Sequence, residues 1–370
     1  MNELLELTED IADRELAPLA ADHERTATFP REAFRTLGRS GLLGLPYPQR
    51  WGGGQVGFRD YLPVLETLAR RWLTVALGVS VHTLSCHALA TAGSDDQRDR
   101  WLPDMLGGDL LGAYCLSEPQ SGSDAAALAT SAEREGDEYV LNGVKAWITH
   151  GGVADFYTVM TRTAESRTGG VTAFLVPADA PGLSSATPER KMGMRGSVTA
   201  QVRLDGVRVA VDRRLGEEGA GMRIALNALD SGRLGIAACA VGLAQAALDV
   251  AVEYAGQREQ FGRPIASFQG VSFTLADMAT GIEAGRALYL AAAERRDRGE
   301  RFSTQAAMAK LFCTDMAMAA TTSAVQILGG AGYVEDFPVE RYMREAKVLQ
   351  IVEGTNEIQR LVIGRALTSH

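Results

Sequence analysis

Apolar residues in the first part of the chain recur at the three- and four-residue steps of an α-helix. The first stripe consists of Leu4, Leu5, Ile11, Ala12, Leu16 and Leu19. Such a stripe is typical of an amphipathic helix that packs on a core. Pro30 opens a second helix, the Pro- and Gly-rich segment 46–54 interrupts the pattern, and more apolar helix follows from Tyr61 to about Leu89. We therefore predict a helical domain over residues 1–112.

The pattern changes at about residue 113, where short runs rich in β-branched and aromatic residues replace the helical stripes. Strands are predicted at 156–160 and 171–176. Asn142-Gly143 and Asp205-Gly206 each lie between two further runs. Because these dipeptides tolerate the positive φ angles of tight turns, two β-hairpins are predicted there. Several short strands in succession indicate a small β-barrel or sandwich over residues 113–212.

From about residue 213 the helical spacing returns in four separate stretches. Three of them carry apolar stripes at about 229–254, 271–282 and 308–325, and the fourth begins near Val339. Four helices of this kind bury their apolar faces most simply against one another. The prediction for residues 213–370 is therefore a C-terminal four-helix bundle, and the whole chain is expected to be an α+β protein, mainly α.

Composition and charge narrow the classes of partner. The 370 residues include 37 Lys and Arg and 46 Asp and Glu, a formal charge of −9, which disfavours general affinity for nucleic acid or anionic membranes. The acidic, amphipathic N-terminus differs from a signal or transit peptide. No run of about 18 apolar residues is present, so no membrane span is expected. Four cysteines fit neither a zinc pattern nor a disulfide framework, which favours reduced thiols and a cytoplasmic protein.

A polar stretch at residues 113–124 concentrates hydrogen-bonding groups after an apolar helical region. Ser117, Gly122 and Ser123 supply hydroxyls and a backbone position that permits close approach. One interpretation is a strand followed by a polar loop. The other is a site for the edge of a flavin ring, which presents carbonyls and nitrogens to amides and hydroxyls. The triplet at 147–149, Trp-Ile-Thr, is either core or an apolar wall with one hydroxyl beside such a ring.

Glu353 is the candidate catalytic residue. It stands in a Glu-Gly-Thr turn between two helical stretches, where a capped helix end is the ordinary interpretation. Leu349, Ile351 and Val352 beside it are apolar. Burial among such residues raises the pKa of a carboxyl group, which suits a base that acts on a weak carbon acid.

Other candidate motifs fit less well. Residues 52–57 match G-x-G-x-x-G in letters but follow a Pro-rich loop rather than a strand, which argues against a Rossmann dinucleotide site. His82, Cys86 and His87 lie on an apolar stretch without a nearby carboxylate, so they are interpreted as core residues. No metal is expected.

The polar stretch, the Trp147 triplet, the Gly/Pro break at 258–269, the segment at 326–330 and the Glu353 turn together resemble the FAD-dependent acyl-CoA dehydrogenase family. They occur in that family's order and over nearly the whole chain. The resemblance implies an N-terminal helical domain, a central β domain and a C-terminal four-helix bundle. It also implies FAD as cofactor, contacted by Tyr114, Leu116, Ser117, Gly122, Ser123, Trp147, Ile148, Thr149, Arg258, Phe261, Gln269, Gln326, Gly329, Gly330, Thr355 and Glu357.

The same resemblance implies an activity and partners. Members of the family convert an acyl-CoA thioester to the trans-2-enoyl-CoA, and Glu353 matches the base of one branch. Another branch has its base at the position of Gly232, where a glycine leaves room for Glu353. The implied substrate contacts are Ser123, Asp230, Ser231, Arg233 and Gly354. Hydride goes to the flavin and electrons to an electron-transferring flavoprotein. Because some flavin contacts come from a neighbouring subunit in the family, a homotetramer is expected.

Substrate and acceptor stay open at this level. Short- or medium-chain acyl-CoA is favoured, because residues 273–280 and 307–312 look similar to members that act on short and branched chains. The alternatives are a flavin-dependent oxidase or monooxygenase on the same scaffold, or a dehydrogenase of acyl-carrier-protein thioesters. A non-catalytic member is disfavoured by the complete set of flavin contacts.

Overall fold

The computed structural model describes residues 2–368, so the outer ends of the first and last predicted domains, 1 and 369–370, lie outside it. The N-terminal part is helical, as its apolar stripes predict. Its helices are α1 (Asn2–Ile11), α2 (Ala17–Thr26), α3 (Arg31–Arg39), α4 (Phe58–Arg71), α5 (Leu73–Ala92) and α6 (Asp95–Leu106), with a π-helical turn at Ala12–Leu16. α5 is buried along nearly its whole length because α4, α7 and the sheet enclose it.

His82 on α5 is a core residue, as interpreted from the sequence. Its side chain is fully buried. Its Nδ1 accepts a hydrogen bond from the backbone N–H of Gly112 at 3.0 Å, and its Nε2 contacts the carbonyl oxygen of Met105 at 2.9 Å. Burial lowers the pKa of His82 to about 3, so the ring is neutral and ties α5 to the sheet and to α6.

The strands of the central part form one mixed sheet. They are β1 (Gly112–Cys115), β2 (Ser131–Glu135), β3 (Glu138–Thr149), β4 (Phe156–Arg162), β5 (Val171–Pro177), β6 (Leu183–Ser185), β7 (Thr199–Ala210) and β8 (Arg214–Leu215). Their order is β6-β7-β3-β2-β4-β5-β8, and β1 pairs in parallel with β4. Residues of β4 and β5 alternate between a cluster shared with α5, α6 and α7 and a second cluster shared with β3 and β7. The sheet therefore bends back on itself to enclose the second cluster.

The two predicted hairpins at Asn142-Gly143 and Asp205-Gly206 are wrong. Both dipeptides lie inside 12-residue strands, β3 and β7, which pair with each other. The register shifts there, so that Asn142 stands opposite the pair 205–206, and Asn142 Oδ1 accepts a hydrogen bond from the N–H of Gly206 at 2.8 Å. Gly206 has a φ of 63°. The preference for positive φ that the sequence revealed thus serves a β-bulge and not a turn.

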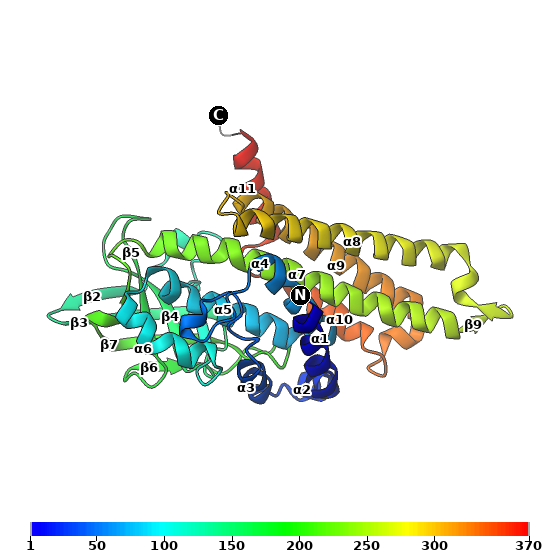
Figure 1. Ribbon diagram of the computed structural model, residues 1–370, viewed down its shortest axis with the longest axis horizontal. Helices are drawn as coiled ribbons and strands as arrows, with labels where there is room; N and C mark the ends of the chain where they lie inside the picture. The colour runs from blue at the N-terminus through cyan, green and yellow to red at the C-terminus, as the bar shows by residue number, and fades with distance from the viewer. Residues whose placement is uncertain (1, 369–370) are drawn as a thin grey trace.

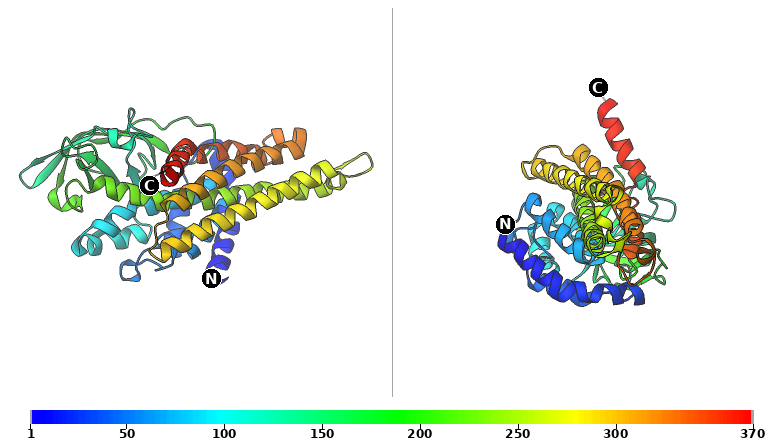
Figure 2. Two further views of the ribbon diagram at one scale, coloured as in Figure 1. Left: turned by 90° about the horizontal axis from the view of Figure 1, so that it is seen from above. Right: turned by 90° about the vertical axis from the view of Figure 1, so that its right-hand side faces the viewer.

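Three long helices and two shorter ones make up the C-terminal part. They are α7 (Gly221–Gln257), α8 (Gln269–Asp297), α9 (Ser303–Leu328), α10 (Val339–Leu349) and α11 (Asn356–Thr368). α7, α8 and α9 run together to the end of the molecule farthest from the sheet, where β9 (Glu259–Gln260) and β10 (Arg263–Pro264) form a small hairpin (Figure 1). α10 packs on α7 and α9 and completes the bundle, whereas α11 projects from the body (Figure 2). The first half of α7 also packs on β4 and β5, so one helix joins sheet and bundle.

Three helical segments are long and apolar enough to cross a membrane by length and composition alone, namely α5, α7 and residues 303–333. In this fold, 89% of the apolar window of α5 and 78% of that of α7 are buried inside the protein. Core packing therefore explains their apolar composition. The window in residues 303–333, which include α9, is 39% buried and leaves apolar side chains on the outside of the bundle.

Candidate active site

The turn between α10 and α11 presents Glu353. Glu353 and Gly354 both have positive φ, 54° and 89°. Behind the turn, Nζ of the fully buried Lys310 donates to the carbonyl oxygen of Gly354 at 3.0 Å and to Oδ1 of Asn356 at 2.8 Å. A left-handed conformation costs a non-glycine residue on the order of 1 kcal/mol, so it persists only where surrounding bonds impose it. Lys310 and Asn356 supply such bonds and fix the direction of the Glu353 side chain.

Both carboxyl oxygens of Glu353 are buried and have no hydrogen-bond partner among residues 2–368. Desolvation raises the pKa of Glu353 to about 7, although Arg233 and Lys310 oppose the shift. Nη1 of Arg233 donates to Oδ1 of Asp230 at 2.6 Å, while its Nε is buried without a partner in the same described range. Buried polar atoms are rarely left unpaired, and those that are left so call for a functional explanation.

α7 approaches the carboxyl group of Glu353 through Gly232. A Cβ atom at position 232 would lie 2.0 Å from Oε2 and 2.8 Å from Cδ of Glu353. Any side chain there would overlap the carboxyl group, so this position of Glu353 requires glycine. A catalytic base at Glu353 needs this contact, in which position 232 carries no side chain.

The Glu353 carboxyl group faces a cavity of about 410 Å³ between α5, β1, β3 and α7. Most residues predicted to contact the flavin ring and the thioester line it together: Tyr114, Leu116, Ser117, Gly122, Ser123, Trp147, Ile148, Thr149, Arg233, Gly354 and Thr355. Leu77, Val81 and Leu84 on α5 and Ile236 on α7 add apolar surface. These residues come from α5, β1 and the loop after it, β3, α7 and the turn before α11, and only the fold brings them together.

One wall of the cavity suits a planar heteroaromatic ring. Trp147 has a φ of 61° and remains 67% exposed, although Ile148 beside it is buried. The hydroxyl of Tyr114 is buried without a partner in the described chain. Buried Glu118 stiffens the polar loop by accepting hydrogen bonds from Nζ of Lys145 at 2.7 Å and from backbone amides. An exposed aromatic surface and an unpaired hydroxyl on a rigid wall fit the isoalloxazine ring of FAD.

The residues predicted for the nucleotide half of FAD lie outside this cavity. Arg258, Phe261 and Gln269 surround the β9–β10 hairpin at the far end of the bundle, and Phe261 is 94% exposed (Figure 1). Gln326 lies in the last turn of α9, and Gly329 and Gly330 follow the end of that helix. Glu357 is exposed on α11. A single chain therefore does not gather the complete set of predicted flavin contacts.

Two predicted substrate contacts on α7, Asp230 and Ser231, are not among the residues that line this cavity. Asp230 accepts hydrogen bonds from Arg233 and, at 2.9 Å, from Oγ of Ser303. Ser231 accepts a hydrogen bond from Nε of Arg296 at 3.0 Å and borders a second cavity. Within residues 2–368, no group of three or more His, Cys, Asp or Glu side chains is arranged to hold a metal ion.

Sequence reasoning missed Lys310, Asn356 and Arg296. Lys310 carried a usable signal, because it is a charged residue within an otherwise apolar helical stripe. A lysine at such a position is buried only when it is paired. Asn356 and Arg296 carried no comparable signal, since a polar residue at a helix start and an arginine at a helix end are ordinary.

Three family models match successive parts of the chain: the acyl-CoA dehydrogenase N-terminal domain at residues 1–109, middle domain at 113–207 and C-terminal domain at 219–368. The chain is 45% identical to an acyl-CoA dehydrogenase of Bacillus subtilis, covering 98% of this chain and 96% of that one. The butyryl-CoA dehydrogenase of Megasphaera elsdenii superposes with a TM-score of 0.97 at 40% identity, over 99% and 97% of the chains. A chain from a structure described as the electron transferring flavoprotein of Acidaminococcus fermentans gives 0.98 at 39% identity, over 100% and 98%.

Proposed function

The chain belongs to the acyl-CoA dehydrogenase family of FAD flavoproteins, and from that premise we propose that it oxidises an acyl-CoA thioester to the trans-2-enoyl-CoA with Glu353 as base. A short- or medium-chain acyl group is the proposed substrate. Its support is the likeness to a protein described as a butyryl-CoA dehydrogenase.

The observation that carries this proposal is the buried, unpaired carboxyl group of Glu353. Ionised Glu353 takes the proton from Cα of the thioester. Burial favours the protonated carboxyl group that results, and the pKa of about 7 lets both forms occur near neutral pH. The backbone amide of Glu353 is the proposed donor to the thioester carbonyl, where negative charge develops as the proton leaves.

We propose that this wall of the cavity is the binding site of the cofactor. FAD, when bound, supplies the acceptor for the hydride that leaves Cβ. Trp147 and Tyr114 would hold the ring, and Ser117, Ser123 and Thr149 offer hydroxyl groups to its polar edge. Apolar side chains from α5 exclude water from the space between this wall and Glu353.

The test is anaerobic bleaching of the flavin by butyryl- and hexanoyl-CoA in the purified holoenzyme and in Glu353→Gln. We expect the rate of bleaching to fall by at least about 10³-fold, because glutamine cannot accept the proton. FAD content and Tm should stay near those of the unmodified protein. Glu335→Gln, which alters an exposed carboxylate, serves as the matched control. Bleaching of Glu353→Gln at a normal rate would refute the assignment.

Partners and location are further parts of the proposal. A homotetramer is supported by the predicted nucleotide contacts outside the cavity and by exposed apolar side chains such as Phe273, Phe312 and Leu361 on α8, α9 and α11. An electron-transferring flavoprotein is the proposed acceptor of electrons, and the likeness to the structure from Acidaminococcus fermentans supports it. The four cysteines are buried and form no disulfide bond within the described residues, which supports a reducing, cytoplasmic location. Sedimentation of the holoenzyme measures its oligomeric state. Reduction of a purified electron-transferring flavoprotein tests the proposed acceptor.

A further inference from the structure

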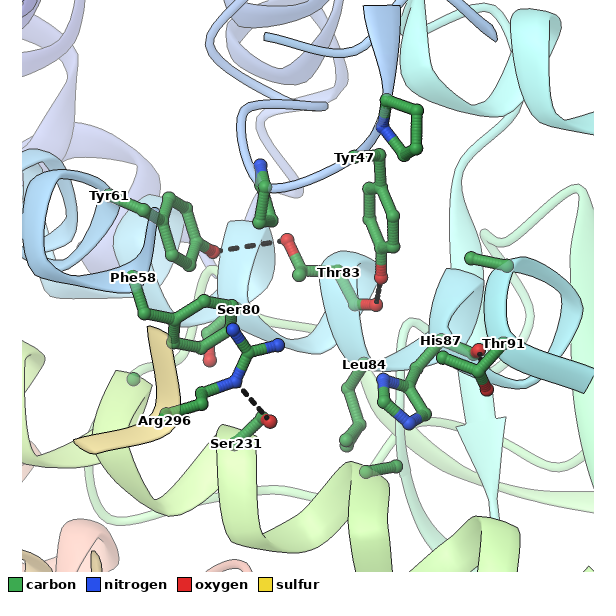
Figure 3. Close-up of a pocket in the computed structure, with 16 residues that line it drawn as sticks. Tyr47, Phe58, Tyr61, Ser80, Thr83, Leu84, His87, Thr91, Ser231 and Arg296 are labelled. Atoms are coloured by element: carbon green, nitrogen blue, oxygen red, sulfur yellow. Dashed lines mark hydrogen bonds between the residues drawn. The ribbon is translucent and has the colours of Figure 1, made fainter. Parts of the chain in front are cut away.

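Figure 3 shows a second cavity, of about 190 Å³. Gly232 lies on its wall and also touches Glu353, so the two cavities adjoin at the catalytic candidate. The wall is formed by the loop at 46–48 and by parts of α4, α5, α7 and α8. If the thioester carbon chain lies beside Glu353, as proposed above, this cavity is the space next to it that can receive the far end of the acyl group.

The lining of this cavity is polar for a site that would hold a plain hydrocarbon end. Hydroxyl groups of Tyr47, Tyr61, Ser80, Thr83 and Ser231 border it. Two of them already have partners: the hydroxyl of Tyr61 contacts Oγ1 of Thr83 at 3.0 Å, and that of Tyr47 donates to the backbone carbonyl oxygen of Thr83. Burial raises the pKa of both tyrosines, so they stay neutral.

Arg296, near the end of α8, is the one charged side chain among the described residues of this wall. Its guanidinium lies over the ring of Phe58, 3.4 Å from the centroid, and extends toward Ser231 (Figure 3). His87, the other basic residue on the wall, has a pKa lowered to about 4 by burial and by Arg296, so it is neutral. The positive charge of the cavity is therefore that of Arg296.

The guanidinium of Arg296 is only partly satisfied by the protein. Nε donates to Ser231, and Nη1 lies 3.5 Å from Oδ1 of Asp297. The carboxylate of Asp297 also accepts hydrogen bonds from the backbone N–H groups of Phe58 and Arg59, both at 2.9 Å, and so caps α4. A guanidinium carries five N–H donors, more than the contacts with Ser231 and Asp297 use, so Arg296 can bind a further acceptor. A ligand that fills the cavity would displace water from these groups, so it must supply an acceptor in its place.

We propose that the acyl group of the substrate ends in a carboxylate and that Arg296 binds this carboxylate, which makes the substrate a short dicarboxylic acyl-CoA. This inference rests on the proposed dehydrogenation. A planar guanidinium matches the two oxygens of a carboxylate, and the hydroxyls around it can donate to the same oxygens. Ser231, which binds Arg296, directly precedes Gly232, and consecutive Cα atoms are about 3.8 Å apart. Arg296 and Glu353 therefore contact neighbouring residues of α7, which favours a short carbon chain between them.

The competing explanation is that Arg296 only fastens the end of α8 to α4 and α7. Matched pairs of thioesters that differ in one terminal group distinguish the two roles. We propose measuring kcat/KM for flavin bleaching with glutaryl- against pentanoyl-CoA and adipoyl- against hexanoyl-CoA. The native holoenzyme should favour the carboxylate member of at least one pair by tenfold or more.

Arg296→Met should reverse this preference. It removes the guanidinium and leaves an apolar side chain, so activity on the carboxylate thioester should fall by about 100-fold while activity on the alkyl thioester rises. Arg296→Lys keeps the charge without the planar fork and should give an intermediate ratio. Arg298→Met, two residues along on an exposed side chain, is the matched control and should keep the native ratio.

A native preference for the alkyl thioesters that Arg296→Met leaves unchanged would overturn the proposal. If Arg296→Met does not fold, the ratio in Arg296→Lys decides in its place. If no thioester bleaches the flavin, the proposed dehydrogenation fails, and calorimetry with the same thioesters tests the cavity separately. Tighter binding of the carboxylate member by the native protein than by Arg296→Lys then supports the assignment of Arg296, and equal binding refutes it.

Discussion

Replacing Gly232 by alanine tests the geometry at Glu353 with a single methyl group. The Cβ of alanine would lie 2.0 Å from Oε2 of Glu353, whereas ordinary contacts begin near 3.4 Å. The carboxyl group must therefore move by more than about 1 Å, since the backbone of α7 is packed on both sides. Displacement of a catalytic group by about 1 Å costs on the order of 100-fold in rate. We expect Gly232→Ala to reduce the rate of flavin bleaching by about that factor.

The free energy of unfolding should change little. Alanine is favoured over glycine within a helix by about 1 kcal/mol, which offsets part of the strain at Glu353. Gly256→Ala, at an exposed position of the same helix where a Cβ meets no atom within 4 Å, isolates this helix effect. It should raise Tm slightly and leave the bleaching rate unchanged.

The assay is rapid mixing of each holoenzyme with a reactive thioester under anaerobic conditions, followed at the flavin absorbance band. Tm and FAD content are measured on the same samples. A normal rate in Gly232→Ala would refute the argument that the carboxyl group acts from the observed position. A slow rate accompanied by loss of FAD or by unfolding would refute the claim that the effect is local.

Four further predictions concern the charge and placement of the site. Activity in kcat/KM should rise with pH and level off above an apparent pKa near 7, because ionised Glu353 is the active form. The pKa of Glu353 rises from 4.5 to about 7 on folding, so the folded state loses stability as pH rises through that window. The free energy of unfolding of Glu353→Gln should therefore increase relative to that of the native protein, by up to roughly 3 kcal/mol between pH 5 and 8, as measured by urea unfolding. Lys310→Met should lower the free energy of unfolding by about 3 kcal/mol and slow bleaching, because the carbonyl of Gly354 loses its donor. An unchanged Tm would contradict this prediction. Lys347→Met, at an exposed position, is the control. Arg258→Met should reduce FAD retention on dialysis without altering the pH profile, if a neighbouring subunit uses it for the nucleotide; full retention would argue against a shared site.

Much of the architecture was determined by local sequence patterns. The helical stripes, the change to strands near residue 113 and the return to helices are periodicities that each segment carries by itself. The start of α10 at Val339 and the core position of His82 were read from spacing and context alone. Glu353 was singled out in the same way, because its apolar neighbours in sequence predict desolvation.

Other features depend on what lies across from a residue in space. Asn142-Gly143 and Asp205-Gly206 carry the local signal of turns, yet their strands pair with each other and the dipeptides form a bulge. The requirement for glycine at 232 comes from Glu353, which is 121 residues away in sequence and 2.0 Å from the missing Cβ. Burial of Lys310 against Gly354 and exposure of Arg296 in a cavity are likewise settled by packing.

The sequence by itself determined which segments are helices or strands and which acidic residue is surrounded by apolar neighbours, since these properties follow from residues close along the chain. Only the tertiary structure decided which side chains share a cavity, which polar atoms remain unpaired and how much room surrounds them. Those outcomes depend on contacts between segments far apart in sequence, and no local pattern records them.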